Sequence, residues 1–268
     1  MIGHNHLGKN GRFGNQMFQY ASTKGIAANR GFDFCIPPGP VNDEEFTDEE
    51  NQHKLFMAFE LSSVKEVNLF PAPYREEASF NFDEDLFNNC EDNVNLYGYL
   101  QSEKYFKHIE TEIRKDFIWR DDVWNTCKEI YDQIIPDGEA ISLHVRRTDQ
   151  VVKQKYHYLQ TDDYFTKALA KLPVDLPVIV FSDEPEWCKT QELFSDDRFL
   201  ISESSDNIHD MCLMSMCQYH IIAASTFSWW GAWLADSKKV IAPASWFGPD
   251  ATLDDSDLIP EGWERIDA

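Results

Sequence analysis

The chain has 268 residues, of which 47 are acidic and 24 basic, and its formal net charge is -23 at pH 7. This balance argues against nucleic acid as a partner, because nucleic acid is bound by concentrated basic surfaces. It also disfavours anionic membranes, so we expect peripheral membrane association at most. Hydrophobic residues make up 43% of the chain, enough for a sizeable core in one large domain or two modest ones.

Targeting signals and disulfides are not expected in this chain. The N-terminal stretch MIGHNHLGKNGRFG lacks the apolar region of a signal peptide, and no run of about 18 apolar residues could span a membrane. We therefore predict a cytoplasmic protein with no signal peptide or transmembrane anchor in this chain. No CxxC pair occurs, so we expect reduced thiols, some of them buried, at Cys35, Cys90, Cys127, Cys188, Cys212 and Cys217.

The first half of the chain predicts a domain that spans residues 1–137. The stretch GRFGNQMFQYASTKGIAANRG indicates a glycine-rich turn and then a helix from about Asn15 to Asn29, with Gly31 just past its end. The acidic, turn-rich stretch PPGPVNDEEFTDEENQ predicts a solvated loop. Residues 61–135 mix short apolar stretches with helical patterns.

The second half predicts a doubly wound α/β domain that spans residues 138–268. In ISLHVRR, Ile141, Leu143 and Val145 share one face of a strand. Thr161 is expected to cap the next helix. Further strands are expected in LPVIVFSDE, YHIIAAS and KKVIAP, and helices in TDDYFTKALAKL, NIHDMCLMSMCQ and TFSWWGAWLA. Strands that alternate with helices at this spacing are typical of a parallel sheet.

Polar residues follow three of the predicted strands, where open α/β sheets bind ligands. They are Arg146-Arg147-Thr148-Asp149, then Ser182-Asp183-Glu184, and last Ser225-Thr226-Phe227-Ser228, which also opens a helix. A helix N-terminus offers free N–H groups to phosphate, and arginine grips phosphate with paired hydrogen bonds. Carboxylates can hold a ribose or a base. The set therefore outlines a site for a nucleoside diphosphate.

The adjacent arginines in HVRRTD have two interpretations. Either they concentrate positive charge to capture an anionic ligand against an acidic background, or they pair with Asp149 and Asp183 as a structural cluster. Neighbouring strand residues point to opposite faces, so Arg146 and Arg147 share one role only if the strand has already ended. Spacing alone leaves both interpretations open.

Several motifs in the same order resemble a known family of enzymes. HVRRTD matches the HxRRxD motif of α-1,2-, α-1,6- and protein O-fucosyltransferases. GRFGNQMFQYA, ASTFSWWGAWLA and KKVIAPASWF resemble the bacterial-type α-1,2-fucosyltransferases, and YGYLQSEKYFKHIETEIRKDF and FSDEPEWCK fit the same family. The resemblance runs from Gly11 to Phe247 and is weak over residues 37–80.

The resemblance implies a GT-B fold, in which two Rossmann-like domains face each other across a cleft. It implies an inverting transferase that moves L-fucose from GDP-L-fucose to the 2-hydroxyl of a terminal galactoside, without a metal ion. The acceptor would be a galactose-terminated glycan. The oligomeric state is not indicated.

The same resemblance implies roles for individual residues. Arg146 would hold the diphosphate and stabilise charge on the departing GDP. Arg147 would be a second donor or a structural partner. The remaining donor-binding residues would be His144, Asp149 and Asp183 in the same pocket, Asp210 on the guanine, Ser225, Thr226 and Ser228 on phosphate or ribose, and Gly14, Asn15 and Gln16 over the phosphates and fucose, with Arg12 assisting.

Two departures from the family pattern bear on linkage and mechanism. Thr148 stands where the common bacterial form has glycine, and in this respect HVRRTD is closer to the α-1,6 enzymes. An α-1,6 or α-1,3 linkage is therefore an alternative. The loop QVVKQKYHY lacks the glutamate of the α-1,6 enzymes, which leaves His157 or Asp149 as the candidate base. A non-catalytic GDP-sugar or glycan-binding protein and a metal-dependent transferase are two further hypotheses. Trp229, Trp230 and Trp233 are predicted to be core residues.

Overall fold

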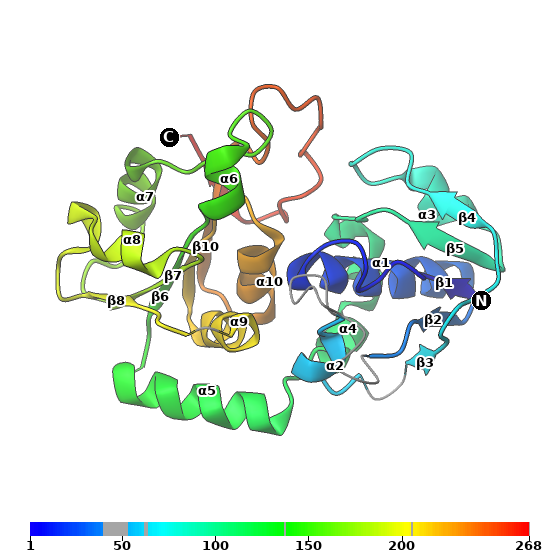
Figure 1. The fold of residues 1–268 in the computed structure, drawn as a ribbon, viewed down its shortest axis with the longest axis horizontal. Helices are drawn as coiled ribbons and strands as arrows, with labels where there is room; N and C mark the ends of the chain where they lie inside the picture. The colour runs from blue at the N-terminus through cyan, green and yellow to red at the C-terminus, as the bar shows by residue number, and fades with distance from the viewer. Residues whose placement is uncertain (40–52, 62–63, 137, 205, 268) are drawn as a thin grey trace. The chain divides into compact units, whose positions relative to one another are not determined.

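A computed structural model describes residues 1–39, 53–61, 64–136, 138–204 and 206–267. The chain forms two compact units, shown with their elements in Figure 1. Unit 1 comprises Met1–Arg120 and Leu253–Pro260, and unit 2 comprises Asp121–Thr252 and Glu261–Ala268. The acidic loop predicted within residues 37–52 lies mostly outside the described residues. Each unit has its own sheet and is described by itself below.

Unit 1 is built on a five-stranded sheet whose described pairings are all parallel. Its order is β3 (Lys65–Glu66), β2 (Phe34–Ile36), β1 (Ile2–Gly3), β5 (Val94–Tyr97) and β4 (Tyr74–Glu76). The strand order reverses between β1 and β5. Polar segments that follow β1 and β5 therefore meet at one edge of the sheet, and His4 Nε2 lies 3.3 Å from the carbonyl oxygen of Gly98 there.

The predicted first helix is confirmed as α1 (Phe13–Arg30), which ends at Gly31 in the left-handed conformation with φ 70°. Small residues on α1 allow close packing: a Cβ on Gly25 would stand 2.0 Å from the carbonyl oxygen of Tyr105. The other helical elements of unit 1 are α2 (Leu55–Ala58), α3 (Glu84–Asn89), η2 (Glu103–Tyr105), η3 (Lys107–Ile109) and α4 (Glu110–Asp116).

Unit 2 contains the doubly wound sheet that the sequence predicts, again with parallel pairings throughout. Its order is β11 (Glu264–Ile266), β10 (Lys239–Pro243), β9 (Tyr219–Ile221), β6 (Ile141–Val145), β7 (Val178–Ser182) and β8 (Phe199–Ile201). From β6 the chain builds outward through β7 to β8, and from β9 outward through β10 to β11. The switch point of the sheet therefore lies between β6 and β9, and the HVRRTD motif runs from the last two residues of β6 into α6.

Two layers of helices cover this sheet. Ile141, Leu143 and Val145 share a core with α7 (Asp162–Leu169) and α8 (Pro185–Lys189), as expected from their common strand face. Thr161 caps α7 by accepting a hydrogen bond from the Tyr164 N–H. α9 (Asn207–Met216) packs between α10 (Thr226–Leu234) and α5 (Asp121–Ile134), and the short elements α6 (Thr148–Val152) and η4 (Glu192–Phe194) complete the unit.

The tryptophans of α10 form an aromatic core, as predicted. Trp229 and Trp230 are fully buried and Trp233 nearly so. The ring centroids of Trp229 and Trp230 are 4.9 Å apart in an edge-to-face arrangement that favours aromatic pairs. This core fixes α10 firmly, and with it the helix N-terminus that the sequence singles out as a phosphate site.

The division of the chain into two units differs from the predicted boundary at 137/138. α5 belongs to unit 2, because it packs on α9, where the Cys127 thiol lies 3.6 Å from the His209 carbonyl oxygen. Leu253–Pro260 returns to unit 1, where the Ser102 hydroxyl donates to the Asp257 carbonyl at 2.9 Å. Both differences come from tertiary packing that composition does not reveal.

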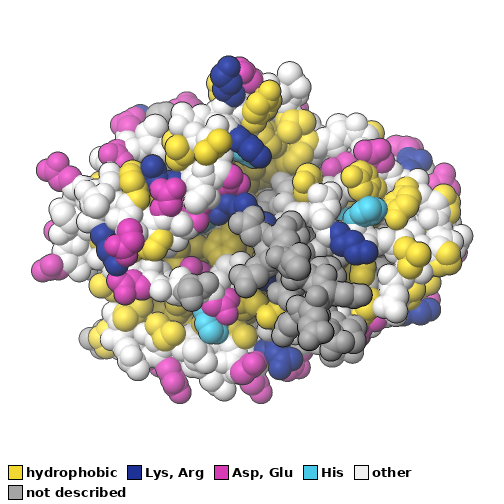
Figure 2. Space-filling view, in the orientation of Figure 1, with side chains coloured by type: hydrophobic (Ala, Val, Ile, Leu, Met, Phe, Trp, Pro, Cys, Tyr) yellow, Lys and Arg dark blue, Asp and Glu magenta, His cyan; other side chains and the backbone are white. Residues whose placement is uncertain are grey.

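All six cysteines are free and buried, in agreement with the expected thiols. No helix within the described ranges is long and apolar enough to cross a membrane. Asp and Glu side chains are scattered over the face shown in Figure 2, with Lys and Arg side chains among them. Among the described residues, the acidic side chains on this face are therefore dispersed rather than gathered in one patch.

Candidate active site

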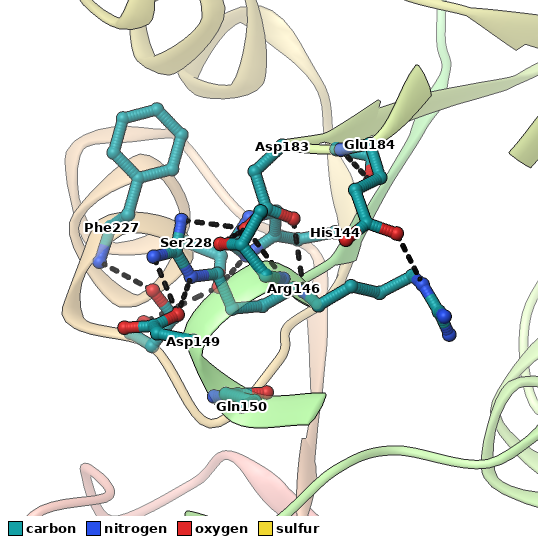
Figure 3. A network of polar contacts seen from close by, with 12 residues as sticks. His144, Arg146, Asp149, Gln150, Asp183, Glu184, Phe227 and Ser228 are labelled. Atoms are coloured by element: carbon teal, nitrogen blue, oxygen red, sulfur yellow. Dashed lines mark hydrogen bonds and ion pairs between the residues drawn. The ribbon is translucent and has the colours of Figure 1, made fainter. Parts of the chain in front are cut away.

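Arg146 lies just beyond the end of β6, at the switch point, and two carboxylates hold its side chain (Figure 3). Its Nε and Nη2 donate to Asp149 Oδ1 at 3.0 and 2.7 Å, and its Nη1 lies 3.0 Å from Asp183 Oδ2. The side chain is only 17% exposed, so solvent screens these pairs weakly. The guanidinium is therefore held in one orientation.

Asp183, which follows β7, also fixes the backbone after β6. Its Oδ1 accepts from the Arg147 N–H at 2.9 Å, and its Oδ2 accepts from the Thr148 N–H at 3.1 Å and from the Thr148 hydroxyl. One carboxylate thus binds two consecutive backbone N–H groups and the Arg146 side chain. This contact turns the chain out of β6 into α6.

Arg147 points to a different set of groups from Arg146. Its Nε donates to Glu184 Oε2 at 2.9 Å, and its guanidinium carbon lies 3.6 Å from the ring centroid of Trp187. A planar guanidinium stacked on an aromatic face is a favourable cation–π contact. Arg147 therefore fastens α8 to the end of β6.

The arginine pair lies among carboxylates. Arg146 and Arg147 contact three carboxylates, those of Asp149, Asp183 and Glu184. The pairs with Asp149 and Asp183 are those of the second interpretation, and the pair with Glu184 is an additional one. Any anion that binds here is held by directed N–H and O–H donors rather than by net charge.

His144 links β6 to α10. Its Nδ1 lies 2.8 Å from the Ser228 hydroxyl oxygen, and that hydroxyl lies 3.3 Å from the Ser225 carbonyl oxygen. Burial lowers the pKa of His144 to about 4, opposed by the nearby Asp183 carboxylate, so the imidazole is neutral at physiological pH. Both contacts are satisfied when Nδ1–H donates to Ser228 and the hydroxyl donates to Ser225.

The N-terminus of α10 opens beside this histidine. Ser225 is its N-cap, and the Ser225 hydroxyl accepts from the Phe227 N–H. Thr226 and Ser228 follow in the first turn, and the Phe227 ring centroid lies 5.5 Å from that of His144. Arg146 with Asp149 and Asp183, and His144 with Ser228, thereby lie close together at the carboxyl edge of β6, β7 and β9 (Figure 3), and the Asp183 carboxylate also acts on His144 through its charge.

Asp210 lies further along the same edge, beyond β8. The Ser202 hydroxyl, just after β8, donates to Asp210 Oδ1 at 2.7 Å. Burial raises the pKa of Asp210 to about 7, with the Ser202 hydrogen bond opposing the change and the Asp206 carboxylate adding to it. A carboxyl group that titrates near neutral pH is a frequent property of binding and catalytic sites.

The loop that contains His157 is held by a neighbouring segment. His157 pairs with Phe247 in an isolated antiparallel bridge, and Gly248 N–H donates to the Tyr156 carbonyl at 3.0 Å. A Cβ on Gly248 would stand 2.5 Å from the Gln154 carbonyl oxygen, so a side chain there would push the loop away. His157 itself is partly exposed, and it is outside the network around Arg146.

The predicted site residues of unit 1 gather around the turn before α1. Gly11 has φ +94°, and Arg12, an exposed residue, precedes the helix as its N-cap. Gln16 is fully buried, donates from Nε2 to the Gly11 carbonyl at 3.3 Å and accepts from the Lys54 N–H at 2.9 Å, so it braces this turn. Asn15 Oδ1 accepts from Gln101 Nε2 at 3.0 Å, and Gly14 is buried.

The structure also shows contacts that sequence reasoning missed. They involve Glu184 and Trp187 on Arg147, and Gln150 in α6, whose amide bonds the Ala224 carbonyl. The motif FSDEPEWCK contained the first two, but nothing in its spacing indicated stacking. In the part of the chain that the structure describes, no group of three or more His, Cys, Asp or Glu side chains is placed to hold a metal ion.

Comparison with known proteins places this geometry in a family. The model of glycosyl transferase family 11 matches residues 1–266. The chain is 32% identical to an alpha-1,2-colitosyltransferase of Escherichia coli, over 96% of this chain and 97% of the relative. It is 26% identical to the human galactoside alpha-(1,2)-fucosyltransferase 1, over 93% of this chain and 69% of the relative.

Solved structures share the fold at low sequence identity. The fucosyltransferase NodZ from Bradyrhizobium superposes with a TM-score of 0.55 at 17% identity, over 84% of this chain and 90% of that one. POFUT1, solved in complex with GDP-fucose, superposes with a TM-score of 0.53 at 12% identity, over 88% of this chain and 94% of that one. The fold is GT-B, as expected, and the chain belongs to glycosyl transferase family 11.

Proposed function

We propose that this glycosyltransferase moves L-fucose from GDP-L-fucose, with inversion, to the 2-hydroxyl of a terminal galactoside. The observation that carries the proposal is the convergence of the Arg146 guanidinium and the hydroxyl-rich N-terminus of α10 at the switch point of unit 2. Two relatives with α-1,2 in their names support the linkage, and the galactoside comes from the name of one of them.

In the proposed reaction the acceptor 2-hydroxyl oxygen forms a bond to C1 of fucose while the bond from C1 to the phosphate oxygen breaks. GDP leaves with the electron pair, and the hydroxyl proton passes to a base. Arg146, Ser225, Thr226 and Ser228 would donate hydrogen bonds to the diphosphate as its charge grows. Asp210 would accept from the guanine. No metal ion is required in this scheme, because these donors take its place.

Two groups remain candidates for the base, His157 and Asp149. Asp149 already accepts two hydrogen bonds from Arg146 on one oxygen, while His157 is in a loop that Phe247 and Gly248 hold in place. Replacement of each in turn, by His157→Gln and Asp149→Asn, separates them. The variant that loses the base limb of the pH–rate profile identifies the group that takes the proton.

The strongest alternative donor sugar is colitose. The E. coli relative at 32% identity is named for colitosyl transfer, and colitose is fucose without the 3-hydroxyl. A site that bonds the fucose 3-hydroxyl discriminates against the sugar that lacks it, because buried polar partners are then left unsatisfied. The ratio of kcat/KM for GDP-fucose and GDP-colitose therefore decides which donor the site is built for.

The proposal is tested by incubating the protein with GDP-fucose and galactose-terminated oligosaccharides in EDTA, and by assigning the product linkage and anomeric configuration by NMR. An α-1,2-linked fucose is the expected product. An α-1,6 or α-1,3 linkage would overturn the linkage assignment and keep the donor. GDP binding without turnover on any galactoside would indicate a binding protein, and loss of activity in EDTA would indicate a metal-dependent transferase.

A further inference from the structure

We infer that Gln150 is a positioning residue that sets the N-terminus of α10 relative to Arg146. This inference rests on the proposed function, because it concerns how the donor diphosphate is held. Gln150 lies in α6, four positions after Arg146, and only 3% of the residue is exposed. Its Nε2 donates to the Ala224 carbonyl oxygen at 2.9 Å. Ala224 directly precedes Ser225, the N-cap of α10.

This hydrogen bond spans the switch point of the sheet. α6 follows β6, whereas Ala224 follows β9, and the strand order reverses between these two strands. The contact between His144, in β6, and Ser228, in the first turn of α10, is a second connection across the same switch point. The α10 N-terminus is therefore attached at two points to the segment His144–Gln150, and Gln150 supplies the contact to the chain that leads into the helix.

Burial of the Gln150 side-chain amide costs free energy, so packing alone does not explain why glutamine stands here. Gln150 Oε1 has no hydrogen-bond partner among the described residues and is out of reach of solvent. Leaving such an atom unsatisfied is unfavourable, and an apolar side chain of similar size would avoid that penalty. What an apolar side chain cannot do is bond the Ala224 carbonyl. The directional bond to the strand-to-helix turn is thus the property that distinguishes glutamine here.

The consequence for function follows from the geometry of the diphosphate grip. Arg146 is fixed from the β6 side by Asp149 and Asp183, and Ser225 and Thr226 approach from the β9 side. A diphosphate held by both sides requires their separation to be constant, and errors of about 1 Å in such arrangements reduce rates by up to 10²-fold. Loss of the Gln150 bond should weaken contacts to the β-phosphate and leave the guanine end unaffected.

The experiment compares Gln150→Met with Gln160→Met in the full-length protein. Methionine keeps the length and bulk of glutamine and removes the hydrogen bond. Gln160 is a matched control, because it is also buried, donates from Nε2 to a main-chain carbonyl, that of Tyr158, at 3.0 Å, and has an unsatisfied Oε1 among the described atoms. Its bond, however, is to a residue two positions away and does not span the switch point.

Calorimetric titration with GDP and with GMP measures the two Kd values, and the fucosyl-transfer assay measures kcat and the KM of the acceptor. We expect Gln150→Met to raise the Kd for GDP about tenfold and that for GMP less than twofold, to lower kcat and to leave the KM of the acceptor unchanged. Gln160→Met should bind both nucleotides as the wild type does. Gln150→Asn, which withdraws the amide by one methylene, should shift GDP binding in the same direction and serves if the methionine variant does not fold.

Three results overturn the inference. They are wild-type GDP binding in Gln150→Met and Gln150→Asn, equal losses for GDP and GMP, or an equal loss in Gln160→Met, any of which would make the bond merely structural. These outcomes leave the proposed function standing as long as the wild type binds GDP. If the wild type itself does not bind GDP, the proposed function fails, and the inference about Gln150 fails with it.

Discussion

The Asp183→Asn substitution keeps the shape of a side chain that organises the HVRRTD segment and removes its charge. Asp183 Oδ1 accepts from the Arg147 N–H, and Oδ2 accepts from the Thr148 N–H and hydroxyl and pairs with Arg146. An amide has one oxygen, so either orientation places its NH₂ group against a backbone N–H. At least one hydrogen bond is lost, and the ion pair becomes a neutral contact.

The magnitude follows from burial. Asp183 is 17% exposed, so its bonds are of the charged and weakly screened kind, each contributing about 1.5–3 kcal/mol. We therefore expect Asp183→Asn to lower the free energy of unfolding of unit 2 by about 2–4 kcal/mol. Glu184→Gln is the matched control. Glu184 is 34% exposed and pairs with Arg147, and an exposed pair of this kind contributes about 1 kcal/mol or less.

Urea denaturation followed by tryptophan fluorescence measures both variants, because the buried tryptophans of α10 report on unit 2. Asp183→Asn should also weaken GDP binding, since Arg146 and the backbone after β6 lose their anchor. The reasoning is refuted if Asp183→Asn unfolds within about 0.5 kcal/mol of the wild type, or no more easily than Glu184→Gln.

Four further predictions follow. Asp149→Asn should weaken GDP binding about tenfold, because it removes one of the two carboxylates that hold the Arg146 guanidinium in one orientation, and calorimetric titration tests this; tighter binding would contradict it. GDP binding should strengthen as pH rises through about 7, where Asp210 ionises, and Asp210→Asn should abolish that dependence. The pKa of Asp210 is about 7 in the folded chain and has an ordinary value of 3.8, so the stability of the protein should fall as pH rises between these two values. Asp210→Asn should therefore stabilise the protein at pH 8 but not at pH 4. Arg147→Lys should lower thermal stability through loss of the stacking on Trp187 while GDP affinity stays within about twofold, and a large loss of affinity would instead make Arg147 a ligand contact.

Much of unit 2 was predictable from local signals. The apolar runs in ISLHV and VIVFS, the Thr161 cap and the composition of TFSWWGAWL indicated β6, β7, α7 and α10 with nearly correct ends. The strands β8 and β11 have three residues each, too short for periodicity to reveal. In unit 1 the strands have two to four residues, and they form through long-range parallel pairing that no local pattern records.

The candidate site was likewise predictable only in part from the sequence. The rule that ligands bind beyond strand ends placed Arg146, Asp183 and Ser228 together, and the family resemblance added His144. The Arg146–Asp183 pair, the His144–Ser228 contact and the effect of the Asp183 charge on His144 show that these residues are neighbours. Sequence alone could not decide whether the arginines gather positive charge or are paired with carboxylates, because that depends on side-chain directions at the ends of two strands. The bond of Gln150 was equally hidden, since its partner is a main-chain carbonyl 74 positions away.

The central claim is that the network around Arg146 is a donor-nucleotide site, and the most direct test is calorimetric titration of GDP and GDP-fucose, in EDTA, into the wild type and Arg146→Ala. We predict that the wild type binds both and that the variant loses about 2 kcal/mol or more of binding free energy, the scale of a lost charge-assisted contact. Denaturation of the ligand-free variant controls for unfolding. A folded Arg146→Ala variant that binds GDP as tightly as the wild type would contradict the account, and so would a wild type that does not bind GDP.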